Sequence, residues 1–239
     1  MKDRRLLQVR VGVQRPLPLA GRRLREQIDS FVVWAEDCGL QIKSRASDYA
    51  HQVFCRLRIQ DQRRILRSFQ TYFEVLKTLR QRGQDPWDSK RFLWAYLSKH
   101  QLQPCSAVLR HIEGNEALEI FSRDYTQVFR NFQFLEAYSG SLFDLLVLDW
   151  MTLFRREVAA QEKLFLQMEA SFRQSPSVQE FVDSEAHQVQ SRFGKSEFYF
   201  VQHLIRSPLL SREKRRRRVE NLLVSSRWLG SPSRFSFAG

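Results

Sequence analysis

The sequence is poor in the residues that build disulfide scaffolds and phosphate-binding loops. Its 239 residues include three cysteines, Cys38, Cys55 and Cys105, and nine glycines. Three widely spaced cysteines fit reduced thiols better than a disulfide framework. The sequence contains neither a glycine-rich nucleotide loop nor the GxSxG turn of a serine hydrolase. These absences weigh against a small secreted scaffold, a nucleotide-dependent enzyme and a hydrolase of that class.

Long apolar runs are also missing. No stretch approaches the roughly 18 apolar residues that span a bilayer, and the most apolar run, Leu142–Phe154, is interrupted by Asp144 and Asp149. The first residues contain no long apolar segment and no small-residue cleavage site, so we expect no secretory signal there. We therefore expect a cytoplasmic protein without a transmembrane segment.

The titratable residues form no catalytic or metal-binding pattern. His100, Cys105 and His111 are the closest set, but their separations of five and six residues match no common zinc-ligand spacing. Asp144 and Asp149 lie on different faces of an expected helix, so they cannot converge on one substrate. The sequence therefore predicts no cofactor, no metal ion and no catalytic residue, and a non-enzymatic role is expected.

Positive charge is abundant, and it lies at the two ends of the chain. The formal net charge is +13. Residues 1–25 carry eight Lys or Arg against one acid, and residues 207–239 carry eight against two. The residues between them carry 23 of each sign. The pattern predicts a neutral body with two cationic arms, which would account for non-specific contacts with anions.

The run from Lys214 to Arg218 is the most conspicuous cationic feature. Guanidinium groups match the geometry of phosphate oxygens, and adjacent cations attract a polyanion at low salt. A solvated loop between two strands and a membrane-surface contact are the alternative interpretations. The candidate residues for binding nucleic acid or another anion are Arg4, Arg5, Arg22, Arg23, Arg212, Lys214, Arg215, Arg216, Arg217 and Arg218.

Hydrophobic periodicity predicts helices throughout the first hundred residues. Apolar residues recur at helical spacing over residues 21–39, 44–57, 61–82 and 86–103. Gly39 and Gly83 are expected to end two of these helices, and Asp85-Pro86-Trp87-Asp88 is a start signal. Residues 1–13 are expected to form a basic arm or a short strand.

The second half of the chain mixes both periodicities. Ala107–Ile112 and Ala117–Phe121 flank Gly114-Asn115 and predict a hairpin. The closing runs Phe198–Ile205 and Val219–Trp228 predict two antiparallel strands. Between the hairpin and these strands the spacing predicts helices over residues 124–135, 141–173 and 175–193.

This order of a hairpin, several helices and closing strands resembles the PAS-like sensory domains over residues 105–230. The resemblance is one of pattern, and the long helical middle departs from the more compact family. The predicted fold is mainly α with a smaller α+β part, a helical bundle followed by a helix-rich domain with a few antiparallel strands. The predicted division is an arm (1–13), a helical domain (14–103), an α+β sensory-like domain (104–230) and a flexible tail (231–239).

Three functions are compatible with these patterns. The first is a non-enzymatic regulatory or sensory protein that binds a ligand or a macromolecular partner, with the helical part mediating dimerisation or relay. The second is a DNA- or RNA-binding protein that uses the terminal arginine clusters, and the third is a structural or adaptor subunit. A ligand pocket in the sensory part would be lined by aromatic residues that alternatively form core, namely Phe129, Phe132, Phe134, Tyr138 and Trp150.

Overall fold

The computed structural model describes most of the chain between residues 18 and 228. The described residues are 18–42, 47–104, 112, 116–124, 126–138, 140–173, 182–183, 186–191, 198–211 and 219–228. None of the helices within these ranges is both long and apolar enough to cross a membrane.

The N-terminal part is a layer of four helices: α1 (Leu19–Glu36), α2 (Asp48–Arg56), α3 (Ile59–Gln81) and α4 (Ser89–Lys99). Phe31 of α1 packs against the rings of Phe69 and Phe73 of α3, with centroid distances of 5.6 and 5.2 Å. Gly39 and Gly83 follow α1 and α3 with φ of +83° and +68°, a conformation that favours glycine. All four predicted helices are confirmed.

The C-terminal part combines four short or medium helices with an antiparallel sheet. The helices are α5 (Phe132–Ala137), α6 (Leu142–Val147), α7 (Trp150–Leu153) and α8 (Val158–Arg173). The strands are β1 (Leu102–Pro104), β2 (Ala117–Ser122), β3 (Gln127–Arg130), β4 (Phe154–Arg156), β5 (Val182–Asp183), β6 (His187–Ser191), β7 (Phe198–Ser211) and β8 (Val219–Trp228). Their order in the sheet is β3-β2-β8-β7-β6-β4, and β1 and β5 pair with β7.

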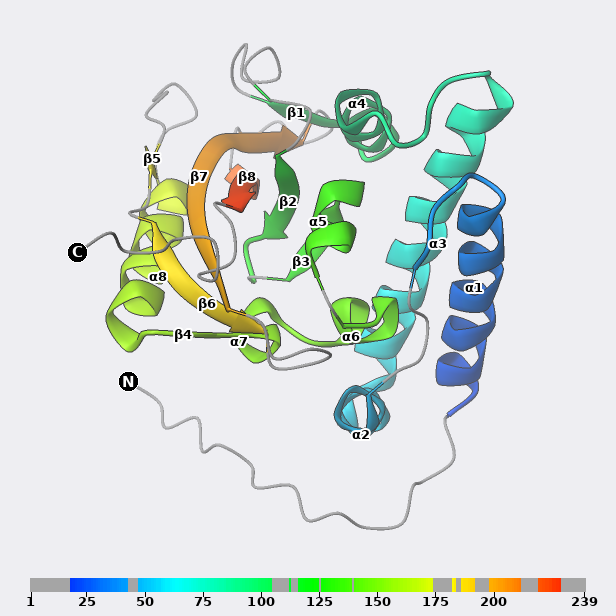
Figure 1. Cartoon of the computed structure of the whole chain (residues 1–239), viewed down its shortest axis with the longest axis horizontal. Helices are drawn as coiled ribbons and strands as arrows, with labels where there is room; N and C mark the ends of the chain where they lie inside the picture. Colours follow the sequence, from blue (N-terminus) through cyan, green and yellow to red (C-terminus); the bar gives the residue numbers. More distant parts are fainter. Residues whose placement is uncertain are drawn as a thin grey trace, which may run out of the picture.

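The long strand β7 organises this sheet. One of its edges pairs with β8, and β6, β5 and β1 pair with successive stretches of β7. The register with β8 shifts between Ile205 and Ser207, a bulge of the kind that bends a strand. Figure 1 shows β7 curving through the sheet. β7 continues past this bulge, and Pro208 pairs with Leu222 of β8.

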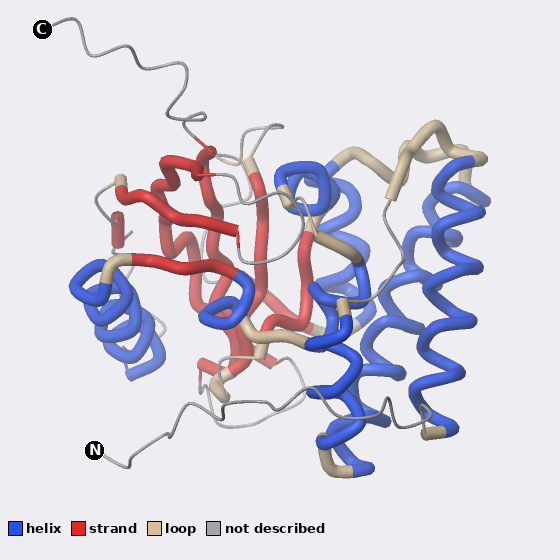
Figure 2. Tube along the Cα trace, turned by 60° about the horizontal axis from the view of Figure 1, so that its bottom comes forward, coloured by secondary structure: helices blue, strands red, loops and turns tan. Residues whose placement is uncertain are grey.

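The sheet lies between the helical layer and α8 (Figure 2). One hydrophobic cluster runs from the helices into the sheet and includes Phe31, Phe69, Phe92, Phe129 and Leu223. A second cluster, built from Phe121, Trp150, Leu164, Met168, Phe172, Leu222 and Val224, lies between the sheet and α8. The helical part and the α+β part thus share core packing, and their division into domains stays a prediction.

The fold class predicted from the sequence is confirmed. A helical bundle precedes an α+β part with antiparallel strands, and the closing strand pair appears as β7 and β8. The sheet has eight strands in the described residues, which is more than the few that were expected. The expected strand or arm at residues 1–13 and the tail at 231–239 lie outside the described residues.

The hairpin and the helix expected at residues 124–135 are placed differently in the structure. Residues 107–111 lie outside the described part, and β2 forms its hairpin with β3 instead. Asp124 accepts a hydrogen bond from Ser122 Oγ and lies 3.3 Å from the backbone nitrogen of Thr126, so it closes the turn between the two strands. The predicted helix is wrong over β3, and α5 begins only at Phe132.

The two long helices predicted over 141–173 and 175–193 are wrong as continuous elements. Asp149 accepts a hydrogen bond from the Thr152 backbone, so it starts a new helix, and β4 follows before α8 begins. In the second segment β6 replaces the helix at residues 187–191, where Val189 pairs with Tyr199 of β7. Pairing with strands outside each predicted helix has overridden the local helical spacing in both places.

Candidate functional site

Two tyrosine hydroxyl groups cover the outer edge of β3, the terminal strand of the main sheet order. Tyr96 of α4 donates a hydrogen bond to the carbonyl oxygen of Val128 at 2.7 Å. Tyr72 of α3 donates to the carbonyl oxygen of Arg130 at 2.8 Å. These carbonyls are two residues apart and therefore leave the strand on the same side. The helical layer thus satisfies an edge that would otherwise be open to pairing with another chain.

Both hydroxyl groups are held as donors by their surroundings. Tyr72 and Tyr96 are almost fully buried, with 8% and 1% of their surface exposed. Burial raises the pKa of each phenol above its usual value, because the phenolate would lose its hydration. The two groups therefore remain protonated throughout the neutral range.

An ion pair forms a further connection between α3 and the β2–β3 turn. The Arg64 guanidinium contacts both carboxylate oxygens of Asp124, at 2.7 and 3.3 Å. This guanidinium holds the pKa of the Asp124 carboxyl well below its usual range. The Arg64 and Asp124 side chains are 45% and 55% exposed, so the pair contributes no more than about 1 kcal/mol.

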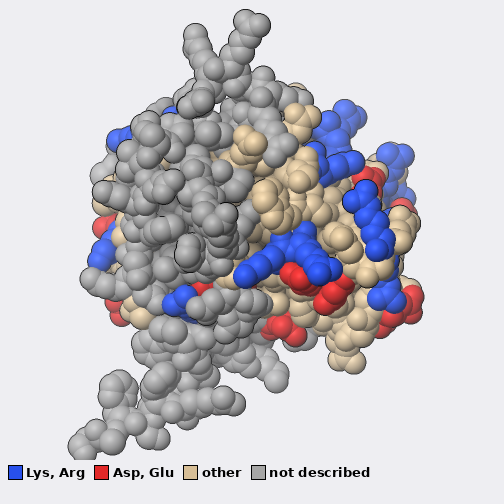
Figure 3. All heavy atoms as spheres, turned by 90° about the horizontal axis from the view of Figure 1, so that it is seen from above, with Lys and Arg blue, Asp and Glu red and all other residues tan. Residues whose placement is uncertain are grey.

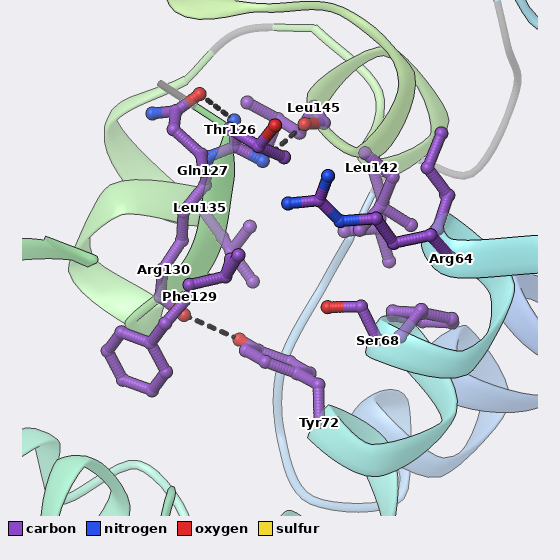
Figure 4. A pocket seen from close by; sticks show the side chains of 14 residues that line it. Arg64, Ser68, Tyr72, Thr126, Gln127, Phe129, Arg130, Leu135, Leu142 and Leu145 are labelled. Carbon is purple, nitrogen blue, oxygen red and sulfur yellow. Dashed lines mark hydrogen bonds between the residues drawn. The ribbon is translucent and has the colours of Figure 1, made fainter. Parts of the chain in front are cut away.

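A cavity of about 70 Å³ lies beside these connections, between α3, β3 and α6. Arg64, Ser68 and Tyr72 extend from α3 toward the side formed by β3 (Figure 4). Apolar side chains complete its wall, including Phe129, Leu135, Leu142 and Leu145. A cavity of about 150 Å³ can hold benzene, so this one matches a guest of about three or four heavy atoms.

Arg130 supplies a buried cation to the cavity wall. Arg130 has only 7% of its surface exposed. The guanidinium donates to the carbonyl oxygen of Leu145 in α6 and to the side-chain oxygen of Gln127. Its Nε atom has no hydrogen-bond partner among the described residues. Burial lowers the pKa of Arg130 to about 10, and the group stays charged at neutral pH.

A buried carboxylate and a second arginine adjoin Arg130 on the sheet. The Gln127 amide donates to Glu119, so Gln127 bridges Glu119 and Arg130. Arg156 lies over the Trp150 ring at 4.6 Å and has its pKa lowered to about 10 by burial. Burial also raises the pKa of Glu119, while the charges of Arg130 and Arg156 oppose this shift. Two cations therefore share one carboxylate, which leaves the cluster with excess positive charge.

This arrangement is suited to binding. The polar groups that line the cavity are hydroxyls, a side-chain amide and two guanidiniums, and none of the lining residues is His, Cys, Asp or Glu. General acid–base chemistry near neutral pH commonly uses His, Cys, Asp or Glu side chains. Within the described part of the chain no cluster of His, Cys, Asp and Glu could hold a metal ion. The cavity instead offers hydrogen-bond donors and positive charge to a small acceptor-bearing guest.

Most of the residues predicted to bind anions lie outside the described part of the chain. Arg4, Arg5, Arg212 and the run Lys214–Arg218 lie outside the described residues. Arg22 and Arg23 are exposed near the start of α1. That these residues bind an anion stays a prediction, as does the formation of one surface by the two clusters.

The five aromatic residues predicted to line a pocket are distributed over several sites. Phe129 lines the cavity described above, and the other four are not among its lining residues. Phe134 and Tyr138 are buried against Phe154, with ring centroids at 6.3 and 5.6 Å. Phe132 contacts Trp87 at 5.1 Å, and Trp150 belongs to the cluster under α8. Their role in ligand binding stays a prediction.

The residues that carry charge into the interior were not among those predicted from the sequence. Glu119 lies within the apolar run Ala117–Phe121, and Arg130 directly follows Val128 and Phe129. A charged residue inside a short strand with apolar neighbours is rarely buried without a partner. The positions of Glu119 and Arg130 among apolar residues were therefore the available signal, and they would have pointed to β2 and β3.

Comparison with solved structures gives similarity at low TM-scores to PAS and LOV domains over about half of the chain. No family model and no curated protein matches this sequence. The Cycle PAS-B domain of Drosophila melanogaster with bound ethylene glycol is 9% identical at a TM-score of 0.37, covering 47% of this chain and 98% of that chain. A tryptophan-to-alanine variant of that domain with bound glycerol is 8% identical, with the same TM-score and coverage. A variant of RsLOV is 16% identical at a TM-score of 0.35, covering 53% and 66%. No property of these proteins is transferred to this chain at such scores.

Proposed function

We propose that this chain is a regulatory protein of the sensory kind, in which the cavity between α3, β3 and α6 binds a small guest. The element order supports the proposal, because the hairpin β2–β3, the helices α5–α7 and the strands β6–β8 follow the sequence of elements expected of a PAS-like domain. The protein would act by a change between two packed states, without a chemical step.

The observation that carries the proposal is the position of the cavity at the contacts between layers. Tyr72 connects α3 to the backbone of Arg130, and the Arg130 guanidinium contacts the backbone of Leu145 in α6. All three residues line the cavity. A guest that contacts them would change how the helical layer packs on the sheet edge. The helical layer would then transmit binding to a partner.

The chemistry of the wall favours a small carboxylate as the guest. The Arg130 Nε donor has no partner among the described residues, and the nearby Glu119 is shared with Arg156. Hydrogen bonds that involve an ionised group are about twice as strong as those between neutral groups. A carboxylate with a short apolar body would satisfy the donor and contact the leucine side chains.

The test uses the full ¹⁵N-labelled chain titrated with acetate, with acetamide as the neutral probe of the same shape. We expect saturable amide shifts in α3, β3 and α6 with acetate, and weaker binding of acetamide. Leu146, which is half-buried in the cavity wall, provides a blocking variant, Leu146→Phe. Leu166 is 66% exposed on α8, so Leu166→Phe is the matched control.

Acetate shifts that saturate in the parent and in Leu166→Phe, but not in Leu146→Phe, would support the proposal. Shifts that stay linear with acetate concentration would contradict it, because they would mean that the cavity admits no guest. Saturable shifts confined to one element would contradict the coupling between the layers. Equal binding of acetate and acetamide would contradict only the role proposed for the positive charge.

A further inference from the structure

A second concave site lies on the helical layer, away from the residues that line the first cavity. A groove of about 960 Å³ runs between the C-terminal half of α3 and the length of α4. Its lining includes four cationic residues, Lys77, Arg82, Arg91 and Lys99, and one acid, Glu74. This excess of cations makes the groove electropositive. Figure 3 looks onto the upper end of the molecule and shows Lys and Arg side chains over its described part, with Asp and Glu side chains among them.

Two of these cations are available to a ligand. Arg91 is 3.1 Å from Asp88, and Lys77 lies 4.3 Å from the centre of the Phe73 ring. Arg82 and Lys99 are exposed, and no ion pair joins either of them to another described residue. Exposed and unpaired cations at the side of a groove favour an anionic occupant.

An exposed tryptophan lies in the same groove. Trp94 of α4 has 48% of its surface exposed, although most large apolar side chains of this layer are buried. Its indole is a flat surface on which a nucleobase can stack, and neighbouring cations can follow the phosphates of the same strand. These two features together characterise surfaces that bind single-stranded nucleic acid.

An acidic helical peptide is the other occupant with suitable charge. Such a helix docks through several apolar anchors spaced three and four residues apart. Of the other apolar residues in the lining, Val75 and Leu79 are buried, and Ala95 is half-buried and small. Trp94 thus provides a single large contact, which fits base stacking better than the docking of a helix.

We infer that the α3–α4 groove binds single-stranded nucleic acid, with Trp94 stacking on a base and Arg82 and Lys99 contacting phosphates. The inference is independent of the small-guest cavity and of the terminal arginine clusters. It assigns nucleic-acid binding to the folded helical layer.

The test is fluorescence anisotropy of a labelled oligothymidylate of about 12 nucleotides with the full chain, at about 50 and 200 mM salt. We expect Trp94→Ala to weaken binding about tenfold and Trp94→Phe to retain most of it, because phenylalanine also stacks. Arg82→Gln combined with Lys99→Gln should reduce the salt dependence of binding. Leu166→Ala, at an exposed apolar residue of α8, is the matched control and should have no effect.

A chain in which Arg215, Arg216, Arg217 and Arg218 are replaced by serine separates the groove from the basic run. Binding that persists in this chain and is still weakened by Trp94→Ala supports the inference. Binding lost in this chain but unchanged by Trp94→Ala would overturn it in favour of the basic run. Binding of poly-glutamate without binding of oligothymidylate would overturn it in favour of an acidic protein partner. Circular dichroism of each variant establishes that its fold is intact.

Discussion

Replacing Tyr72 by phenylalanine should remove one hydrogen bond between the helical layer and the edge of the sheet. The substitution keeps the aromatic ring, which lies 4.9 Å from Phe92 between centroids, and removes only the hydroxyl. The carbonyl oxygen of Arg130 would then lose the donor that lies 2.8 Å from it. Ring packing is conserved, so the measured effect reports the hydrogen bond.

The expected loss follows from the burial of both partners. A net hydrogen bond contributes about 1 kcal/mol, and a buried acceptor left without a donor costs about 1–3 kcal/mol. Tyr72 is 8% exposed, so water replaces the hydroxyl poorly. We expect the free energy of unfolding to fall by about 2 kcal/mol. For a chain of this length, that change lowers Tm by about 4–8 °C.

Urea denaturation followed by far-ultraviolet circular dichroism measures the change, and Tyr138→Phe provides the matched control. The Tyr138 hydroxyl is also buried, but it has no hydrogen-bond partner among the described residues. Its removal should leave the free energy of unfolding unchanged or raise it, because an unsatisfied polar group disappears. Equal losses in the two variants would refute the reasoning, since the effect would then come from the missing atom and not from the bond.

Two further predictions concern the charged groups beside the cavity. Arg64→Gln should lower the free energy of unfolding at neutral pH by less than about 1 kcal/mol. The pKa of Asp124 is depressed in the folded state, so the loss should be present above pH 3.8 and should shrink as the pH falls below that value; a loss that persists in acid would contradict it. Burial raises the pKa of Glu119, so its protonation favours the folded state; the stability of Glu119→Gln should match that of the parent below pH 4.5 and exceed it as the pH rises. Urea denaturation across this pH range tests both variants, and a loss of about 3 kcal/mol in Glu119→Gln at neutral pH would contradict the second prediction, because it would mean that the carboxylate is needed to compensate the buried Arg130 and Arg156.

The helical half of the fold could be predicted because its signals are local. In α3 the buried residues Phe69, Phe73, Leu76 and Leu79 follow one face, and Gly83 marks the end of the helix. The stripe and the terminating glycine lie within one segment, so no information from distant residues is needed. The same holds for α4, where the Asp88 side chain accepts hydrogen bonds from the first turn.

The strands between residues 124 and 193 could not be predicted because pairing with other strands determines them. Residues 127–130 become a strand because β2 lies beside them, although their spacing permits a helix. Val189 is buried through its place beside β7. In each case the partner strand lies outside the segment that it organises. A period read from a single segment therefore selects the wrong element there.

The candidate cavity also had a signal in the sequence, which differs in kind from the helical stripes and from the strand pairings. Arg64, Ser68 and Tyr72 are spaced four residues apart on α3, so they lie on one face of the helix beside the apolar stripe. Figure 4 shows the three side chains extending from that face toward β3. Arg64 pairs with Asp124, and Tyr72 donates a hydrogen bond to the backbone of Arg130. Arg64 and Tyr72 also line the cavity. The groups that hold the layers together are therefore the groups that the proposed guest would contact, so we expect its binding to change the stability of the interface.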